Sequence, residues 1–541
     1  MSDIRFNSWL HRSGTGGVYQ DSSGRVGIGT SSPGEDLHIS SNSPYIKLED
    51  IDNSQDWLIR GTAWFDIYDV NNSASRLVID STGRVGINTA TMTTANAGFD
   101  DLVIRSSAGG NTGITFLSST TAQGTLAFAD GSSSTAPYRG YLQYSHNGDR
   151  LVLGAGGADR VTVDTDGNVN ISGVTTAKSF VPTEGQLSHK NLIINGAMTV
   201  AQRGTSSTTS NDYVCDRFNL SYNGQDEVPT FTQAAVASGT TPYNLGFRNC
   251  LKVTNGNQTG GVGSSDYIQI KYVPEAQDIA TSGWNYKSAS SYITLSFWIK
   301  SSVAQAFTGS IWSRDGTQKN YKFDTPSLSA DTWTKVTKTI PGHADLSFDN
   351  DNGIGAWIFL YPMIGQSYTT SASDTETWIA HSSGAYANNI TTTWWTTNDA
   401  TFEITGVQLE VGSVATPFEH RSYGDELKRC KRYYQQYPEL AADGYAPYPG
   451  SGAAIMTTTT AGWAMNYDTM RASPTVSWTG NHRMVELNTD RAVTGFAAYH
   501  GSASTGWMVI TASGGGMTAG NAAIVGRNND TTAFMKFSAE L

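Results

Sequence analysis

The sequence predicts an all-β protein, and three observations lead to that class. Aromatic residues make up 11% of the 541 residues, and together with Val, Ile and Thr they favour strands. The chain holds 57 Gly, and Gly, Asn and Ser gather between apolar runs, as they do in turns. Short runs such as YITLSFWIKSS recur and are typical of strands. The aromatic content argues against disorder, and the length suits about three or four domains.

Composition excludes several classes of function. The formal charge is −12 and no basic stripe is visible, so a nucleic-acid partner is not expected. The N-terminal residues lack the apolar core of a secretory signal, and the most apolar stretch, AWIFLYPMIG, is too short to span a bilayer. The three cysteines are too few and too scattered for a disulfide scaffold or a zinc site. We therefore expect assembly in a reducing cytoplasm, with no cofactor and no metal.

One short motif occurs three times in the first third of the chain, as VYQDSSGRVGI, LVIDSTGRVGI and VTVDTDGNVNI. Asp tolerates turn geometry and Gly supplies positive φ, so each copy predicts a β-hairpin. An isolated hairpin is marginal in water, and the copies are too widely and unevenly spaced for a solenoid. Their Val and Ile faces therefore need another surface. The simplest one is the same hairpin in other copies of the chain, around a shared axis.

The first copy also carries a resemblance to a known family. GRVGIGTSSPGEDLHI resembles the G-x-V-G-I-G-T-x-x-P-x-x-x-L-x-I element of bacteriophage tail fibres and related virion appendages, whereas the later copies keep only GRVGINT and GNVNISG. The resemblance implies an elongated homotrimer with an N-terminal virion anchor at residues 1–20 and a β-rich stalk at 21–187. The alternative is an ordinary β domain with accidental similarity. The anchor residues would be Ile4, Phe6, Trp9 and Leu10.

A second resemblance covers the middle of the chain. KNLIINGAMTVAQRG, ITLSFWIKSS and FEITGVQLEVGSVATPFEH are similar to motifs of the carbohydrate-binding-module-like sandwich found in phage tail fibres and receptor-binding proteins. The residues agree independently, because YITLSFWIKSS, WTKVTKTI and AWIFLYPMI are strand-like and are separated by Gly, Asp, Asn and Ser. We expect a jelly-roll-like β-sandwich at residues 188–420.

The stretch GDELKRCKRYYQQY is the one convincing helix in the sequence. Apolar and aromatic side chains recur there at steps of three and four, with Lys and Arg outside them. The pattern predicts a short helical neck at residues 421–437 whose seam lies on the trimer axis. A helix packed on its own sandwich remains the alternative. The seam residues would be Tyr423, Leu427, Cys430, Tyr434 and Tyr437.

Residues 438–541 show strand–turn patterning and predict a small C-terminal β-sandwich tip. If the N-terminus is fixed to the virion, the opposite end meets the cell, so the loops of the tip should bind the receptor. In the sandwich, TTTWWTTND is interpreted as a strand, on which neighbouring side chains point to opposite faces, so one tryptophan should be exposed. Other strand tryptophans, such as Trp298 and Trp357, are expected in the core. The candidate receptor-binding residues are Tyr467, His500, Trp507, Trp394 and Trp395.

No catalytic arrangement stands out in the sequence. It contains no G-x-S-x-G elbow and no His pair at zinc spacing, and DNDNG misses the spacing of a calcium loop. A polysaccharide-degrading tailspike would need two carboxylates about 5–10 Å apart in a groove. It would usually also show the short repeat of a right-handed β-helix, which is not visible here. Binding through aromatic faces with amide and hydroxyl groups is therefore the preferred interpretation.

Taken together, the two resemblances imply a homotrimeric phage tail fibre, a structural virion protein and not an enzyme, which would mediate host-cell recognition and adsorption through its C-terminal domains. Its expected partners are two further copies of itself, another virion protein (tail adaptor, nozzle or baseplate), and a host polysaccharide or outer-membrane receptor. The alternatives are another trimeric appendage, such as a head fibre, horn or decoration protein, and, less favoured, a polysaccharide-degrading tailspike.

Overall fold

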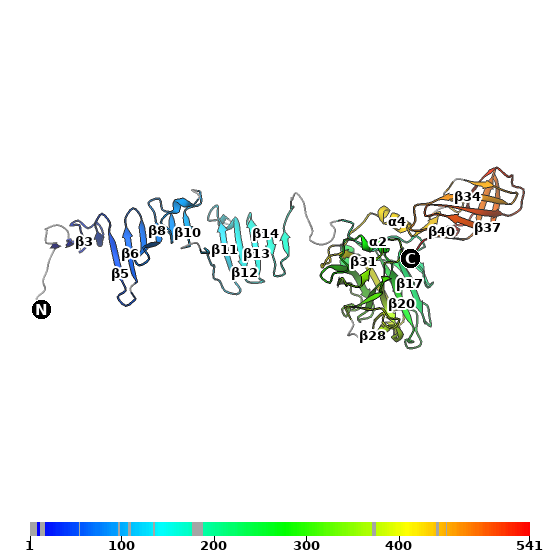
Figure 1. Ribbon diagram of the computed structural model, residues 1–541, viewed down its shortest axis with the longest axis horizontal. Coiled ribbons are helices and arrows are strands. Elements are labelled where there is room, and N and C mark those ends of the chain that lie inside the picture. The colour runs from blue at the N-terminus through cyan, green and yellow to red at the C-terminus, as the bar shows by residue number, and fades with distance from the viewer. Residues whose placement is uncertain are drawn as a thin grey trace. The chain divides into compact units, whose positions relative to one another are not determined.

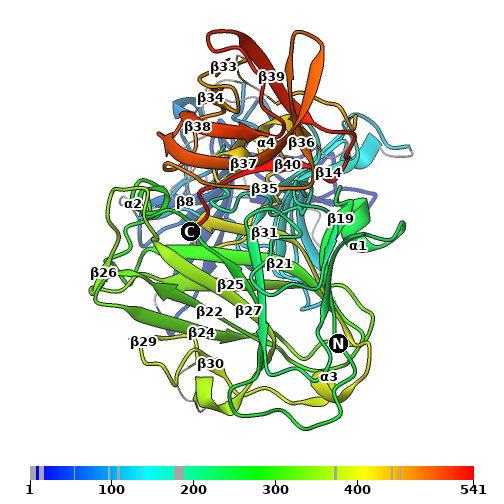
Figure 2. The same ribbon diagram turned by 90° about the vertical axis from the view of Figure 1, so that its right-hand side faces the viewer.

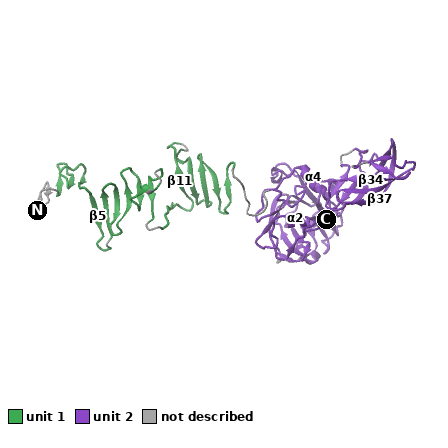
Figure 3. Cartoon of the chain, turned by 45° about the horizontal axis from the view of Figure 1, so that its top comes forward, with its two compact units in different colours: residues 1–178 green, residues 179–541 purple. Residues whose placement is uncertain are grey.

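Strands are far more abundant than helices along the chain, so the predicted all-β class is confirmed. The chain divides into two compact units, residues 1–178 and residues 179–541, which Figure 3 shows in different colours. The computed structural model describes residues 8–10, 17–53, 55–95, 98–106, 110–133, 136–175, 188–370, 375–439, 443–448, 450 and 452–541.

In the described residues of the first unit, the strands form three separate sheets and pair in chain order within each sheet (Figure 1). The first sheet comprises β1 (Ser8–Leu10), β2 (Gly17–Gln20), β3 (Val26–Ile28) and β4 (Leu37–Ile39). The second comprises β5 (Tyr45–Glu49), β6 (Asp56–Gly61), β7 (Phe65–Asp69), β8 (Ala74–Ile79), β9 (Val85–Ile87) and β10 (Leu102–Ile104). The third comprises β11 (Gln123–Phe128), β12 (Gly140–Ser145), β13 (Arg150–Ala155), β14 (Ala158–Val163) and β15 (Val169–Ile171). All neighbours are antiparallel except β3/β4 and β9/β10.

The three D-x-x-G motifs form hairpins, as predicted, between β2 and β3, β8 and β9, and β14 and β15. In the second hairpin the Asp80 carboxylate accepts hydrogen bonds from the backbone N–H groups of Thr82 and Arg84, at 2.9 and 3.1 Å. Gly83 has φ +90°, which a residue with a Cβ adopts only with strain. The motif is therefore a turn in which Asp and Gly have separate, local roles.

Each sheet of the first unit carries a row of aliphatic side chains in cross-strand register. None of these side chains is buried, and several are more than two-fifths exposed. In the first sheet the row is Val18, Ile28 and Ile39. In the second it is Ile46, Ile59, Ile67, Leu77, Ile87 and Ile104. In the third it is Leu126, Leu142, Leu153, Val161 and Ile171.

The face opposite the aliphatic row of the second sheet is covered by its own polar side chains. Arg60 donates to the buried Asp66 carboxylate at 2.6 Å, and Ser75 donates to it at 2.7 Å. The Arg60 guanidinium also lies 3.6 Å from the centroid of the Tyr68 ring. The sheet therefore has one face that its own hydrogen-bonded polar groups and the buried Val78 fill, and one apolar face that the described chain leaves uncovered.

The second unit begins with a sandwich of two six-stranded sheets. One sheet has the order β16-β18-β19-β31-β21-β25, and the other has the order β17-β20-β27-β22-β24-β29. The first consists of β16 (Ser206–Ser207), β18 (Thr230–Ala235), β19 (Asn249–Thr254), β31 (Thr401–Val411), β21 (Tyr292–Ser301) and β25 (Thr334–Pro341). The second consists of β17 (Phe218–Asn223), β20 (Tyr267–Tyr272), β27 (Ala356–Ile364), β22 (Thr308–Ser313), β24 (Lys319–Asp324) and β29 (Trp378–Ala380). The short strands β23 (Asp315–Gly316), β26 (Leu346–Ser347), β28 (Thr369–Thr370) and β30 (Ala387–Asn388) form two additional pairs.

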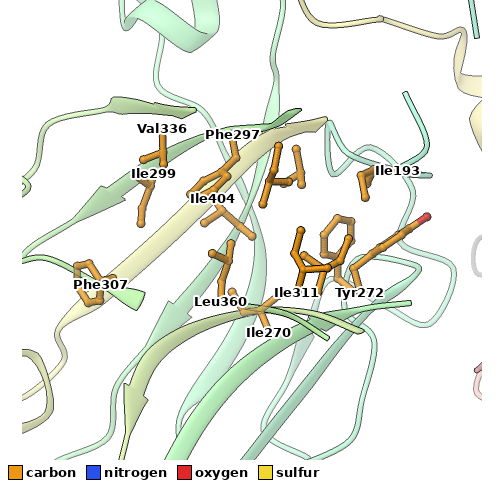
Figure 4. Close-up of a cluster of buried hydrophobic side chains, with 14 of the residues drawn as sticks. Ile193, Ile270, Tyr272, Phe297, Ile299, Phe307, Ile311, Val336, Leu360 and Ile404 are labelled. Atoms are coloured by element: carbon orange, nitrogen blue, oxygen red, sulfur yellow. The ribbon is translucent and has the colours of Figure 1, made fainter. Parts of the chain in front are cut away.

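The core of the sandwich lies between these two sheets. Figure 4 shows Phe297, Ile299 and Ile404 from one sheet facing Ile270 and Leu360 from the other. Every second residue of these strands points inward, which is the alternation that a two-layer β fold requires.

Residues 438–541 form a closed six-stranded barrel, so the expectation of a small sandwich there is wrong. A three-stranded sheet, β32-β40-β35, lies beside it (Figure 2). The barrel consists of β33 (Ala453–Ile455), β34 (Thr460–Asn466), β38 (Thr505–Ala512), β37 (Thr489–Gly501), β36 (His482–Glu486) and β39 (Ala522–Arg527). The sheet consists of β32 (Tyr434–Tyr437), β40 (Phe534–Ser538) and β35 (Thr475–Thr479). The long, bent β37, with its two register shifts, pairs with both β36 and β38, which allows closure.

The helices of the second unit are short. They are α1 (Thr241–Asn244), α2 (Ala276–Ala280), α3 (Thr393–Thr396) and α4 (Tyr423–Lys431), and the 3-10 turns of the chain are η1 (Met92–Thr94), η2 (Ala136–Tyr138) and η3 (Gln366–Tyr368). Within the part of the chain that the structure describes, no helix has the length and apolarity needed to cross a membrane.

Buried ion pairs connect the C-terminal region to the sandwich. Arg432, directly after α4, binds the buried Glu275 carboxylate through two hydrogen bonds of 2.7 Å. Near the end of the chain, Glu540 pairs with Arg203 at 3.0 Å and with the buried Arg217. These contacts fix the sheet β32-β40-β35 against the sandwich.

Candidate functional site

An aromatic groove of about 250 Å³ lies on the outer face of the sandwich, over β20 and β27. Trp357, Phe359 and Tyr361 of β27 reach this face because their neighbours Ile358 and Leu360 point into the core. On β20, Tyr267 and Gln269 alternate with the core residues in the same way. The groove is lined by Tyr267, Gln269, Trp357, Phe359, Tyr361, Ile364, Tyr368 and Tyr386.

Two segments that follow β27 form the far wall of the groove. Tyr368 belongs to η3, and Tyr386 precedes β30, which lies against β22 and β24. The ring centroid of Tyr368 is 6.0 Å from that of Tyr267 and 5.8 Å from that of Tyr386, both in edge-to-face geometry. Edge-to-face contacts hold aromatic rings in defined orientations, so the groove is a preformed surface.

The groove ends at a cluster built around Trp357 and Trp312. The two indoles meet at 4.6 Å with an interplanar angle of 88°, and His381 stacks on Trp312 at 3.6 Å. Burial lowers the pKa of His381, and the positive charge of Arg314 lowers it further. Both effects favour the neutral imidazole at the place where it stacks on Trp312.

The lining residues of the groove carry groups that can contact a ligand. They offer aromatic faces, phenol hydroxyls and the Gln269 amide, whose nitrogen donates to Ser221 at 2.8 Å. None of those lining residues carries a carboxyl group, whereas glycoside hydrolysis ordinarily needs two. Among the described residues, no group of three or more His, Cys, Asp or Glu side chains could hold a metal ion.

The expectation that Trp357 lies in the core is wrong, and none of the residue patterns described above predicts this groove. Trp357 is half-buried and lines the groove instead. A signal was present, because AWIFLYPMI is apolar at both odd and even positions, and a strand with two apolar faces needs a cover on each side. The groove draws its residues from β20, β27, η3 and the segment before β30, and their proximity arises only in the folded chain.

The expectation that Trp394 or Trp395 would be exposed is wrong. TWWT forms α3 and not a strand, and both indoles are fully buried. The Trp394 indole N–H donates to the Thr401 carbonyl oxygen at 3.0 Å, and the side-chain amide of Asn255 donates to the Trp395 carbonyl oxygen at 2.7 Å. One helical turn places both rings in the core of the sandwich, so neither reaches a ligand.

The three residues expected to bind a receptor in the C-terminal region differ in exposure. Tyr467 is buried, and its hydroxyl bonds to Tyr499 and to the carbonyl oxygens of Ser502 and Thr505, so its role is structural. His500 and Trp507 pair across β37 and β38, and their rings stack with centroids 5.9 Å apart. Trp507 is 37% exposed, so this pair forms an aromatic surface on the barrel.

The helical neck differs from the prediction. Helix α4 ends at Lys431, and Tyr434 and Tyr437 lie on β32, which pairs with β40. Cys430 is fully buried, and Leu427 is partly buried, against Ile194 and Val200 of the same unit. Tyr434 is buried beneath the Arg203 guanidinium, while Tyr423 remains 60% exposed. The helix therefore packs on its own sandwich, and the alternative noted from the sequence is the correct one.

Two of the four expected anchor residues, Ile4 and Phe6, lie outside the described residues. Trp9 and Leu10 belong to β1, whose backbone pairs with β2. The segment at residues 8–10 is therefore part of the first sheet.

A larger hollow of about 820 Å³ lies beside α4. Its charged residues are of both signs and several are already paired, as Arg421 is with Glu419 at 2.9 Å. No Trp, Tyr or Phe lines it among the described residues, so it offers no surface comparable to the aromatic groove. The lining residues are His189, Glu419, His420, Arg421, Ser422, Asp425, Lys428, Arg429, Arg432, Asp468 and Thr469.

Comparison with known proteins gives structural likenesses only. No family model and no curated protein matches the chain. The enzymatically active domain of bacteriophage CBA120 tailspike protein 4 is 12% identical, with a TM-score of 0.23, over 41% of this chain and 21% of that chain. The N-terminal cellulose-binding domain of Cellulomonas fimi β-1,4-glucanase C is 10% identical, with a TM-score of 0.20, over 40% of this chain and 99% of that chain. The family 11 carbohydrate-binding module of Clostridium thermocellum, in complex with a β-1,3-1,4-mixed-linked tetrasaccharide, is 15% identical, with a TM-score of 0.18. The match covers 39% of this chain and 98% of that chain. TM-scores this low carry no argument about what this chain binds.

Proposed function

We propose that this protein is a bacteriophage tail fibre, a structural virion protein that assembles as a homotrimer through its first unit and recognises host-cell surface carbohydrate through its second. The observation that carries the proposal is the contrast between the units. The first leaves aliphatic rows uncovered, whereas the second has its own core and an aromatic groove. In this assignment residues 1–20 attach to another virion protein, and no catalytic step is assigned.

The proposed assembly as a homotrimer follows from the physics of a sheet with one apolar face. Burying apolar surface contributes about 25 cal/mol per Å², so a row such as Leu126, Leu142 and Leu153 favours association. Three such faces can close around an axis and leave the polar faces in water, and closed symmetry stops further growth. A face-to-face pair would also cover the rows, so the mass of the assembly decides between the two.

Light scattering tests the assembly. We expect a mass about three times 58.0 kDa for the native chain. Leu126→Asp should abolish the trimer, because it would place carboxylates in an apolar interior. Thr125→Asp is the matched control, since Thr125 is the preceding residue, exposed on the opposite face of β11. A native mass of one or two chains, or equal effects of the two substitutions, would contradict the trimer.

The proposed recognition of host-cell carbohydrate is based on the aromatic groove. Aromatic faces that pack on sugar rings, combined with hydroxyl and amide groups, are what small polar ligands such as saccharides require. Trp357→Ala should therefore abolish adsorption of the fibre to host cells. Trp507→Ala removes an exposed aromatic side chain of the barrel and serves as the comparison. Loss of adsorption with Trp507→Ala alone would assign recognition to the barrel and remove it from the groove.

A further inference from the structure

Two cationic side chains stand at the Trp357 end of the aromatic groove. The Lys271 ammonium lies 5.3 Å from the centroid of the Trp357 ring, and the Arg314 guanidinium lies 3.9 Å from it. Arg314 also lies 4.2 Å from the centroid of Trp312. Lys271 stands on β20, and Arg314 directly follows β22. The chain thus brings two positive charges from separate strands to one aromatic ring.

Among the described residues, neither Lys271 nor Arg314 forms an ion pair or a side-chain hydrogen bond with the protein. Other half-buried arginines of the second unit are differently placed. Arg432 binds the Glu275 carboxylate, and Arg471 donates to the carbonyl oxygens of Ala539 and Asn352. An arginine presents five donors in a fixed fork, so Arg314 keeps its full capacity for a ligand.

The surroundings make these two positive charges unfavourable in the free protein. Burial lowers the pKa of Lys271, and the positive charge of Arg314 lowers it further. Burial also lowers the pKa of Arg314. The carboxylates of Glu540 and Asp315 favour the charged forms of Lys271 and Arg314, respectively, but among the described residues neither forms an ion pair with them. Two partly desolvated like charges without a paired carboxylate are costly for stability, and such arrangements gather at binding sites.

We infer that the groove binds an acidic saccharide, whose ring lies on the aromatic side chains and whose anionic group is held by Lys271 and Arg314. This inference rests on the proposed function and specifies its ligand class. A sugar carboxylate or a sugar phosphate would satisfy both cations, because a guanidinium binds either one through two parallel hydrogen bonds. Packing of the cations on indole faces leaves their N–H groups available to the anion.

Binding of the full-length protein to an immobilised panel of purified acidic and neutral bacterial capsular and lipopolysaccharide glycans tests the inference. We expect binding to acidic members, and loss of binding after carboxyl reduction or after dephosphorylation, which identifies the anionic group. Lys271→Gln combined with Arg314→Gln should weaken binding about tenfold or more. Added salt should weaken binding to the native protein.

Three comparison variants make the test specific. Lys287→Gln with Lys335→Gln removes two exposed lysines elsewhere in the second unit, changes the net charge equally and should leave binding unchanged. Lys271→Arg keeps the charge and should retain most of the binding, which separates loss of charge from loss of folding. Trp357→Ala should abolish binding to every member of the panel.

The outcomes separate this inference from the proposed function. Undiminished binding after removal of the anionic groups, or by the Lys271/Arg314 double variant, would overturn the acidic ligand. The groove would still stand if Trp357→Ala abolished that binding. Native binding by Trp357→Ala, or no binding of the native protein to any glycan, would overturn the groove as well.

Discussion

Residues 17–175 and residues 188–541 are both built from short strands, yet their apolar side chains are buried to very different degrees. In the described part of the first unit, the buried apolar side chains are Val78, Met92 and Val152. The second unit buries large clusters between its sandwich sheets and inside its barrel. Both units have regular hydrogen-bonded ladders, so strand pairing does not by itself produce a buried core.

The difference indicates where each unit obtains its stability. Ordering the backbone costs about 1–2 kcal/mol per residue, and burial of apolar surface is the main term that offsets this cost. The second unit has that burial within one chain. The first unit has matched aliphatic rows instead, and a row buries its area only when a further surface covers it. We therefore expect the two units to respond differently to the same chemical change.

The largest expected effect is loss of a core aromatic from the sandwich. Phe297 is fully buried on β21, and Phe297→Ala should cost the second unit about 3–5 kcal/mol. Differential scanning calorimetry should show its transition move down while the transition of the first unit stays. Phe65→Ala makes the same substitution on the 45% exposed Phe65 of β7, and should shift only the first transition. A single transition that moves with either substitution would contradict the separation of the units.

A smaller effect should appear as a pH dependence confined to the second unit. His482 is buried in the barrel, where its Nδ1 bonds to the Tyr448 hydroxyl at 2.5 Å, and burial lowers its pKa from 6.5 to about 4. At pH values between these two pKa values, the His482 imidazole is protonated in the unfolded chain and neutral in the folded chain. Stability from this group is therefore complete above pH 6.5 and falls, by up to about 3 kcal/mol, as the pH drops towards 4.

Chemical unfolding at a series of pH values measures that dependence. His482→Gln removes the titrating group and should flatten the slope for the second unit, although it also lowers stability at neutral pH by breaking the bond to Tyr448. Equal slopes for the native protein and His482→Gln would show that the imidazole titrates normally in the barrel.

The smallest expected effect concerns a single turn of the first unit. Gly83 has φ +90° and no atom within 4 Å of the position where a Cβ would stand, so Gly83→Ala adds backbone strain without a clash. We expect a loss of about 1 kcal/mol in the first unit. Gly113 is equally open and is not in the left-handed region, so Gly113→Ala should change little. Equal shifts in melting temperature for the two variants would contradict a role for the positive φ of Gly83 in stability.

The sequence predicted those parts of the fold that local chemistry determines. Asp80 and Gly83 specify their hairpin within five residues, because one supplies the acceptor and the other the positive φ. A second glycine of the motif has a separate reason, since a Cβ on Gly86 would meet the Thr89 carbonyl oxygen at 2.4 Å. The third copy has Asn170 at that place and lacks the following threonine, which is why its resemblance is weaker.

The predictions from sequence were wrong where residues far apart in the chain determine the local structure. YYQQY continues a helical pattern, yet Tyr434–Tyr437 pair with β40 and form a strand. TWWT has strand-like composition, yet a single turn of helix buries both indoles. The groove could be anticipated only in part, from the two apolar faces of β27, because Tyr368 and Tyr386 come from two later segments whose places are set by the whole sandwich.

The ion pairs of Glu540 have a consequence for the order of events on the ribosome. Arg203 and Arg217 precede their shared carboxylate by 337 and 323 residues. At common rates of translation, that interval is on the order of half a minute. The hairpins of the first unit can close as soon as they leave the exit tunnel, since each spans only a few residues. The buried Arg217 lacks its counter-ion until Glu540 has been made. The half of the molecule that we assign to recognition is therefore the last to mature, after the first units of neighbouring nascent chains can already have met.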